Sequence, residues 1–164
     1  MQIPAFAALC FLPFVLPLCL YTVFTDMRDM RIKNHAVVAL FAVYAVIGLF
    51  VLPLDIYLWR YVALIVVLVL GIAFNMAGVL GAGDAKFAAA AAPLIWPGDA
   101  ALVMLLFAAN LLAAFCAHRL AKHTRLRDIA PHWKSWVTGS KFPMGMALGG
   151  TLAIYLTLGA ALGS

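Results

Sequence analysis

The sequence has little charge for its length. Only 10% of its 164 residues are charged, 67% are hydrophobic, and its mean hydropathy is +1.09. A soluble domain is usually about half apolar and about a quarter charged. So few polar residues cannot cover a surface that faces water, which excludes a soluble globular domain. The length fits one compact helical bundle, so we expect a single domain over residues 1–164.

Paired cysteines and metal-binding patterns are also lacking. The three cysteines, Cys10, Cys19 and Cys116, lie in apolar stretches with no close pair among them. This favours small hydrophobic core residues over a disulfide or a zinc site. The four histidines form no i, i+4 pair on a predicted buried face beside a carboxylate. We therefore expect no metal and no cofactor.

The first residues lack the positive charge of a signal peptide. Residues 1–5 contain no Lys or Arg, and no small-residue cleavage site follows cleanly. We therefore expect the first apolar run to be a retained membrane span.

Long apolar runs dominate what is present. A helix needs about 20 apolar residues to cross a hydrocarbon core of about 30 Å. The runs predict an all-α bundle of six transmembrane helices, near residues 4–24, 36–54, 58–80, 85–96, 100–117 and 142–162. A charged loop over residues 26–33 and a longer basic loop over residues 118–141 separate some of them.

Positive charges gather on one side of these predicted spans. Six alternating spans place ten Lys and Arg residues on one side and only Arg60 on the other. Lys and Arg are retained on the cytoplasmic side. We therefore expect both termini outside, and we attribute the net charge of +5 to membrane orientation rather than to a nucleic-acid partner. The ten residues are Arg28, Arg31, Lys33, Lys86, Arg119, Lys122, Arg125, Arg127, Lys134 and Lys141.

The fourth predicted span is short. Residues 85–96 would cover roughly 18 Å as a helix, against a core of about 30 Å. With Trp96 at the outer interface, where Trp tends to lie, Asp84 is expected below the cytoplasmic headgroups. Local thinning of the bilayer is the other way to absorb this mismatch.

Two aspartates stand at the same predicted membrane face on separate helices. Asp26 directly follows the first span, and Asp84 closes a Gly-x-Gly-Asp sequence and opens the fourth. Carboxylates at the hydrocarbon boundary are costly and tend to mark function. Two that approach each other share protons, so one acts as acid and the other as base, as peptide hydrolysis by water requires. Gly81 and Gly83 would let an extended substrate backbone come close to Asp84.

Both aspartates also have a simpler interpretation. Asp84 fits an N-cap of the fourth helix, a role for which Asp is preferred. Asp26 fits a solvated loop charge, as we expect for Asp29, which lies at helical spacing from Lys33. Gly-x-Gly-Asp is short enough to arise by chance in roughly 1 in 30 chains of this length. Spacing alone leaves these interpretations open.

Three stretches resemble those of type IV prepilin peptidases. Residues 26–34 resemble their Asp-x-Arg-x-x-x-Ile-x-Asn stretch, and residues 81–87 their Gly-x-Gly-Asp-x-Lys-Leu stretch. Residues 142–147 are similar to the Pro-Tyr-Gly-x-Ala segment that opens their last helix. The three occur in family order and at family-like spacing, and the six-helix plan spans the whole chain.

This resemblance implies an intramembrane aspartyl endopeptidase of the bacterial cytoplasmic (inner) membrane, with Asp26 and Asp84 as its catalytic dyad. One aspartate would hold a water as the base while the other protonates the carbonyl oxygen or the leaving amine. The implied substrates are prepilins and pseudopilins, in which a short basic leader and a small residue precede a hydrophobic helix. The leader would lie in the cytoplasm, and the helix would pack laterally against the bundle.

An insertion found in the larger members of that family is missing. It carries paired Cys-x-x-Cys motifs, and those members also N-methylate the new pilin terminus, so we expect cleavage without methylation. The short form most resembles the peptidases of tight-adherence (Tad or Cpa, Flp-type) pilus systems, and less the archaeal preflagellin peptidases. Lys33, Phe87 and Met144 depart from the usual family residues, which bears on substrate range rather than on the reaction.

Other residues of these motifs have two interpretations each. In the functional interpretation, Lys86 favours the ionised form of Asp84 or contacts a substrate carbonyl. In the simpler one, Lys86 anchors the helix at the membrane interface. Arg28, Arg31 and Asn34 either order the first loop or touch the leader, or they are orientation charges and a helix cap. A basic leader would gain nothing from meeting the two arginines.

The loop over residues 118–141 has Trp133 and Trp136 among its Lys and Arg residues. This mix is typical of a segment that lies on anionic lipid. Contact with the pilus assembly machinery is the alternative interpretation. The sequence predicts no oligomeric state.

Two other functions compete for the same aspartates. A small proton-coupled transporter would use them as a relay, but it would more often keep its carboxylate near the midplane on a broken helix. A scaffold of a secretion or pilus complex gives no reason for two glycines beside Asp84. Presenilin-like aspartyl proteases share Gly-x-Gly-Asp but not the stretch at 26–34. The protease interpretation explains the placement, the pairing and the glycines together.

Overall fold

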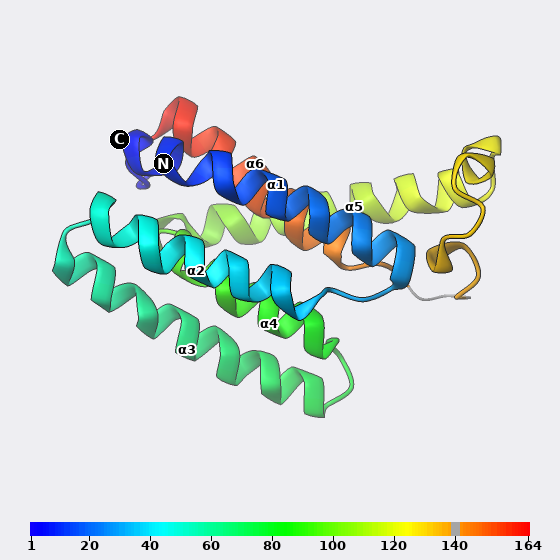
Figure 1. Cartoon of the computed structure of the whole chain (residues 1–164), viewed down its shortest axis with the longest axis horizontal. Helices are drawn as coiled ribbons and strands as arrows, with labels where there is room; N and C mark the ends of the chain where they lie inside the picture. The colour runs from blue at the N-terminus through cyan, green and yellow to red at the C-terminus, as the bar shows by residue number, and fades with distance from the viewer. Residues whose placement is uncertain (139–141) are drawn as a thin grey trace.

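The structure, a computed structural model, describes residues 1–138 and 142–164, and this part of the chain contains helices and no strand. Lys141, one of the ten basic residues counted above, lies outside the described residues. The predicted all-α class is confirmed (Figure 1). The six α-helices are α1 (Ala5–Asp29), α2 (Asn34–Val51), α3 (Leu54–Met76), α4 (Ala82–Ala91), α5 (Ala100–Lys122) and α6 (Gly145–Leu162).

Five of these helices are long and apolar enough to cross a membrane, namely α1, α2, α3, α5 and α6. The exception, α4, has only ten residues and continues as the 3-10 helix η1 (Ala92–Leu94). Pro93 has no backbone N–H to continue an α-helical ladder, which gives a physical reason for the change of helix type. The expectation that the fourth segment is short is therefore confirmed. Of the six predicted transmembrane helices, five are long and apolar enough to cross a membrane.

The end of the first helix was predicted wrongly. The sequence suggested a loop over residues 26–33, but α1 continues to Asp29, and the N–H of Met30 donates to the carbonyl of Asp26 at 2.8 Å. Met30 then leaves the helix in a left-handed conformation with φ 55°. Charged residues end an apolar run, but they do not break a helix when their side chains find partners or water. Asp26 is therefore fixed by helical backbone.

Other boundaries also differ from the prediction by a few residues; helix α3, for example, covers Leu54–Met76 instead of residues 58–80. Helix α5 extends to Lys122 instead of residue 117, and α6 begins at Gly145 instead of residue 142. The later start of α6 follows Pro143, since the residue before a proline is disfavoured in the helical region. The basic loop is accordingly shorter and contains two 3-10 helices, η3 (Arg125–Ile129) and η4 (Lys134–Trp136).

Small residues allow the helices to approach closely around α4. A Cβ on Gly71 of α3 would lie 2.8 Å from the Cβ of Ala85 in α4, and a Cβ on Gly149 of α6 would lie 3.1 Å from the carbonyl oxygen of Cys19 in α1. Close contact of this kind is how membrane helices gain packing energy in lipid. Helix α4 contacts α2, α3 and α6, so it lies inside the bundle.

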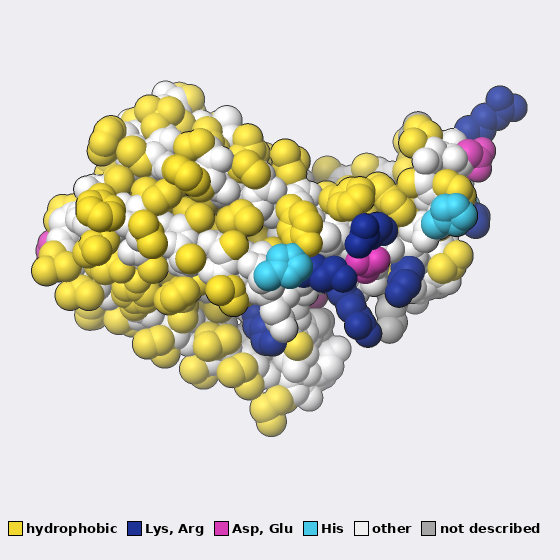
Figure 2. Space-filling model, viewed as in Figure 1, with side chains coloured by type: hydrophobic (Ala, Val, Ile, Leu, Met, Phe, Trp, Pro, Cys, Tyr) yellow, Lys and Arg dark blue, Asp and Glu magenta, His cyan; other side chains and the backbone are white. Residues whose placement is uncertain are grey.

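The surface divides into an apolar body and a charged end. Figure 2 shows hydrophobic side chains over most of the helical body, and Lys and Arg gathered toward the end that carries the segment after α5. Phe6, Phe50 and Trp59 are each more than 65% exposed. Apolar surface of this extent suits contact with lipid. The two chain termini lie together at the opposite end, where the Ser164 hydroxyl donates to the carbonyl of Met1 at 3.0 Å (Figure 1).

Candidate active site

Asp26 lies on the buried stripe of α1 that packs along α6, and its side chain is only 5% exposed. The backbone N–H of Gly145, the first residue of α6, donates to Asp26 Oδ2 at 2.7 Å. The first N–H groups of a helix have no partner within it, so this carboxylate satisfies the start of α6 from a neighbouring helix. The bond fixes the orientation of Asp26.

Gly145 was not among the candidate site residues predicted from the sequence. A Cβ on this residue would lie 2.8 Å from the Cβ and 2.9 Å from Oδ2 of Asp26. Only a glycine therefore lets the backbone reach the carboxylate at the observed distance. The signal was present in the sequence, because Gly145 belongs to the stretch 142–147 that resembles the opening of the family's last helix.

Asp84 lies in the first turn of α4 at the same end of the bundle. Its carboxylate lies against Gly81, the N-cap residue of the helix, and the nearby backbone of Gly81 partly offsets the rise in the pKa of Asp84. A Cβ on Gly81 would lie 2.5 Å from Asp84 Oδ2, which is too close. A glycine at this position therefore leaves the space that the carboxylate of Asp84 occupies. The N-cap interpretation of Asp84 is wrong in detail, since the helix begins at Ala82 and Asp84 reaches back from its third residue.

Gly83 connects this motif to the first one. A Cβ on Gly83 would lie 3.3 Å from the Cβ of Ile32, which belongs to the stretch 26–34. The two stretches that are far apart in sequence therefore pack directly on each other. As Figure 1 shows, the C-terminal end of α1 and the N-terminal end of α4 lie at the same end of the molecule.

The two aspartates also interact electrostatically. Asp84 lies outside the five membrane-spanning helices, and its pKa is raised to about 6, first by burial and then by the charge of Asp26. Within residues 1–138 and 142–164, no Lys or Arg forms an ion pair with either carboxylate. Asp26 is buried and Asp84 partly buried, and two such carboxylates close to each other are costly to ionise together.

An apolar cleft of about 300 Å³ begins at Asp84 and continues along α4. Its floor is α4, where Ala88 and Ala91 leave room because their side chains are small. Helices α3, α5 and α6 form its sides. The lining consists of Val67, Leu80, Asp84, Phe87, Ala88, Ala91, Ala92, Ile95, Val103, Met104, Phe107, Leu148, Thr151, Leu152 and Tyr155.

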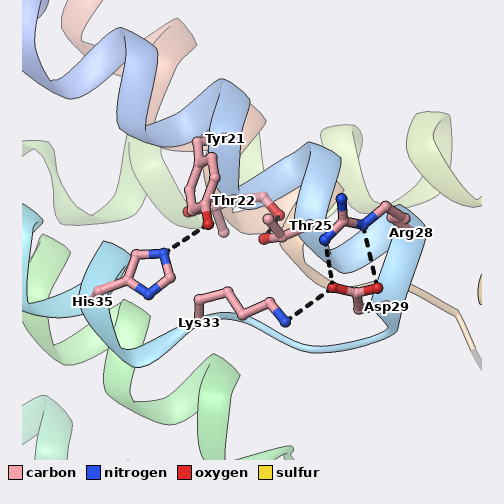
Figure 3. A network of polar contacts seen from close by, with 7 residues as sticks. All are labelled: Tyr21, Thr22, Thr25, Arg28, Asp29, Lys33 and His35. Carbon is pink, nitrogen blue, oxygen red and sulfur yellow. Dashed lines mark hydrogen bonds and ion pairs between the residues drawn. The ribbon is translucent and has the colours of Figure 1, made fainter.

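Arg28 and Lys33 both bind Asp29, three residues beyond Asp26. Arg28 pairs with Asp29 at 3.1 Å and Lys33 pairs with it at 2.9 Å, as Figure 3 shows. The predicted i, i+4 pair is confirmed. In the same view, the hydroxyl of Tyr21 lies 2.6 Å from Nε2 of His35. The contacts of Lys33 and His35 tie the end of α1 to the connection and to the start of α2, whereas Arg28 pairs only with its neighbour within α1.

The other predicted motif residues lie away from the carboxylates. Lys86 Nζ donates to Asn34 Oδ1 at 3.4 Å, so Lys86 links the two motifs and does not pair with Asp84. Asn34 is the first residue of α2 and makes no capping bond, which corrects its interpretation as a helix cap. Arg31 is exposed on the connection between α1 and α2.

No group of three or more His, Cys, Asp or Glu side chains among the described residues is arranged to hold a metal ion. Cys10, Cys19 and Cys116 are all unbridged.

One comparison with known proteins identifies the class. The type IV leader peptidase family matches residues 13–118 of the 164, a stretch that includes Asp26, Asp84 and the motifs around them. No curated protein and no solved structure matches the chain. The match covers more than half of the chain, and several helices are apolar and long enough to span a membrane. The chain is therefore a multi-pass membrane protein that belongs to the type IV leader peptidase family.

Proposed function

We propose that the protein is an aspartyl leader peptidase in which Asp26 and Asp84 are the catalytic pair. One observation carries the proposal: two carboxylates from different helices, Asp26 buried and Asp84 partly buried, interact at one end of the bundle, and no Lys or Arg among the described residues is paired with either. Such a pair holds a single proton over a range of pH, so it supplies one acid and one base together.

The reaction follows from this division of roles. Asp26, oriented by the Gly145 N–H, takes a proton from a water molecule as its oxygen attacks the scissile carbonyl carbon. Asp84, which carries the shared proton, gives it to the carbonyl oxygen. When the tetrahedral intermediate collapses, the bond between carbon and nitrogen breaks. Asp26 then passes its proton to the leaving amine, and the gem-diol proton returns to Asp84.

The cleft along α4 suits the hydrophobic part of a prepilin-like substrate. It starts at Asp84 and is lined almost entirely by apolar side chains. We propose that the substrate helix packs in this cleft, so that the peptide bond before that helix lies beside the carboxylates. The segment that follows the cut would then occupy the alanine-lined floor at Ala88 and Ala91.

The distribution of charge supports cleavage at the cytoplasmic face of the bacterial inner membrane. The C-terminal end of α1, which carries Asp26, and the N-terminal end of α4, which carries Asp84, lie at the same end of the molecule (Figure 1), and Figure 2 shows Lys and Arg gathered toward that end in the same view. Such residues are retained in the cytoplasm. The substrates we propose are Flp-type prepilins and pseudopilins of a Tad pilus system, processed without methylation. The segment from η3 to η4 would lie on anionic lipid, since Ile129 is 81% exposed beside Arg125 and Arg127.

The whole chain would act as one catalytic domain over residues 1–164. Helix α6 lies beyond the family match, yet it packs along α1 and supplies the Gly145 N–H to Asp26. A site that draws on both regions would not survive their separation.

The test is processing of a Flp-type prepilin co-expressed in membranes, scored by a mobility shift. We expect cleavage by the wild type and none by Asp26→Asn or Asp84→Asn, with all proteins at equal membrane levels. Asp29→Asn is the matched control, because Asp29 lies one turn from Asp26 but is paired with two cations. Full cleavage by either of the first two variants would exclude the two-aspartate mechanism.

A further inference from the structure

A row of stacked rings connects α1, the segment after α5, and the residues that precede α6. The ring of Phe24 meets Trp133 edge-on with centroids 5.8 Å apart, and Trp133 stacks on Trp136 at 5.9 Å. Trp136 stacks on His118 at 5.2 Å, and His118 meets Phe142 edge-on at 5.8 Å. We call these five residues the aromatic clamp. Offset-stacked and edge-on rings are the favourable geometries for such pairs.

The two ends of the aromatic clamp belong to the segments that carry Asp26 and Gly145. Phe24 is two residues before Asp26 in α1, and Phe142 is three residues before Gly145, whose N–H binds the carboxylate. Phe142 also meets Phe115 of α5 at 5.8 Å, so it is held from the α5 side as well. The segment before α6 is therefore linked to α1 in two ways, by the aromatic clamp and by the hydrogen bond between Gly145 and Asp26.

Burial separates this arrangement from a simple lipid anchor. Trp136 is 5% exposed and His118 is 1% exposed, so both rings contact protein rather than lipid. The indole N–H of Trp136 donates to the carbonyl of Ala130 at 2.9 Å, which fixes the ring within its own segment. The sequence suggested an interfacial role for both tryptophans, and the structure corrects it for Trp136.

We propose that the aromatic clamp positions the catalytic pair, with Trp136 and His118 holding residues 142–145 so that the Gly145 N–H meets Asp26. These are positioning residues, because they act on Asp26 only through Gly145 and Phe24. The inference rests on the proposed function, since it assigns the aromatic clamp to the reaction that Asp26 performs. It also gives a role to residues 119–138 and 142–145, which lie beyond the family match.

The experiment measures kcat and KM for prepilin cleavage by the full-length protein in detergent or nanodiscs. Trp136→Ala is expected to lower kcat about tenfold with KM changed less than about twofold, because a small displacement of a reacting group costs rate rather than binding. Trp136→Phe keeps a stacking ring and should restore most of the rate. The kcat of His118→Phe should likewise stay near the wild-type value. The kcat of His118→Ala should be lowered about as much as that of Trp136→Ala.

A matched control and a double variant test the route of the effect. Phe41→Leu removes an edge-on pair with Tyr61, which has centroids 6.1 Å apart between α2 and α3, and should leave kcat unchanged. Gly145→Ala already displaces the N–H from Asp26, so adding Trp136→Ala should cost less than about twofold more. Residues that act through one contact show this non-additivity.

Three outcomes would overturn the inference: wild-type kcat in both alanine variants, losses that multiply fully in the double variant, or an equal loss in Phe41→Leu. The Asp26→Asn control separates these from failure of the proposed function. If Asp26→Asn is inactive while Trp136→Ala and His118→Ala are normal, only the aromatic clamp is wrong. If Asp26→Asn is fully active, the proposed function fails, and the assignment of the aromatic clamp fails with it.

Discussion

The two ends of the bundle each bury an aspartate, and the surroundings of the two differ. At the end with the termini, Asp99 is 4% exposed and accepts hydrogen bonds at 2.8–3.0 Å from the backbone N–H groups of Gln2 and Ile3 and from the hydroxyl of Tyr155. At the other end, Asp26 is 5% exposed and accepts a hydrogen bond from Gly145. Burial is nearly equal, but Asp99 has more donors.

This difference agrees with a structural role for Asp99 and with the catalytic role proposed for Asp26. A buried carboxylate whose oxygens are occupied by donors fastens the segments that donate to it. Asp99 in this way ties the chain start to the turn before α5. Asp26 and Asp84 instead retain acceptor capacity, and the charge of Asp26 raises the pKa of Asp84, which agrees with the water activation proposed for the pair. Burial alone does not distinguish the two roles.

The largest effect should separate these aspartates by function. Asp26→Asn or Asp84→Asn should lower kcat by about 10³-fold or more, because the pair then lacks its base or its acid. Asp99→Asn should keep kcat within about threefold of the wild type but lower the thermal midpoint, since donors to Asp99 lose their acceptor. Cleavage assays and thermal unfolding in detergent check both. A catalytic loss in a well-folded Asp99→Asn protein would contradict the comparison.

The second prediction concerns the hydrogen bond to Asp26. Gly145→Ala should lower kcat about 100-fold, because its Cβ would lie 2.8 Å from the Cβ of Asp26 and force the two apart. Gly150→Ala is the control in the same helix, since its Cβ would approach the end of the Asn110 side chain, which can move. Single-turnover cleavage gives both rates, and equal losses would show that α6 packing alone is responsible.

The third prediction is a pH dependence. The pKa of Asp84 is raised from 3.8 to about 6, so the pair keeps its shared proton below about pH 6 and loses it above. Activity should fall up to tenfold per pH unit as the pH rises beyond that value. A rate that keeps rising to pH 9 would show that the proton on Asp84 is not needed.

The same shift predicts an effect on stability. Because the raised pKa belongs to the folded state, the contribution of Asp84 to stability is full below about pH 3.8 and is lost as the pH rises through about 6. Asp84→Asn removes a partly buried charge and should stabilise the protein at pH 7 by about 1–3 kcal/mol. Asp29→Asn, in which the lost carboxylate is paired and more exposed, should give no gain. Denaturation in mild detergent compares the two variants, and equal stabilities would contradict the argument.

The smallest expected effect comes from the cleft. Ala88→Leu would fill part of the floor along α4 and should raise KM about tenfold with a smaller change in kcat. Ala161→Leu places the same side chain on an exposed position of α6 and should leave both values unchanged. Unchanged KM in Ala88→Leu would exclude the cleft as the binding site for the substrate helix.

The sequence was sufficient for the helices and for the identity of the two motifs. Apolar runs of about 20 residues form membrane helices whatever segments lie beside them. The number of residues in the fourth apolar run was enough to predict a segment too short to cross the membrane. The clustering of basic residues at one end was also predictable, because alternating the predicted spans places nearly all Lys and Arg residues on one side. The interpretation of Asp29 as a paired surface charge needed only the helical spacing to Lys33.

The sequence did not decide which buried groups meet. It suggested a loop from Asp26 onward, and it left open whether Lys86 acts beside Asp84 or anchors its helix and whether Asn34 caps a helix. In the structure α1 continues to Asp29, Lys86 contacts Asn34, and Asn34 makes no capping bond. The contact between Lys86 and Asn34 joins separate elements, so it depends on how closely the helices pack and not on local preference. Gly145 reaches Asp26 across 119 residues of sequence only because α6 lies against α1.

Hydropathy and motif spacing therefore determined the class of this protein, its helices and the two aspartates, because each is a property of a local stretch in contact with lipid. Tertiary structure decided that Asp26 and Asp84 interact while Asp99 is fastened to the chain start, and that an alanine-lined cleft continues from the pair. The physical reason is that burial, donors and neighbouring charge are set by the segments that pack around a carboxylate, and these come from distant parts of the chain.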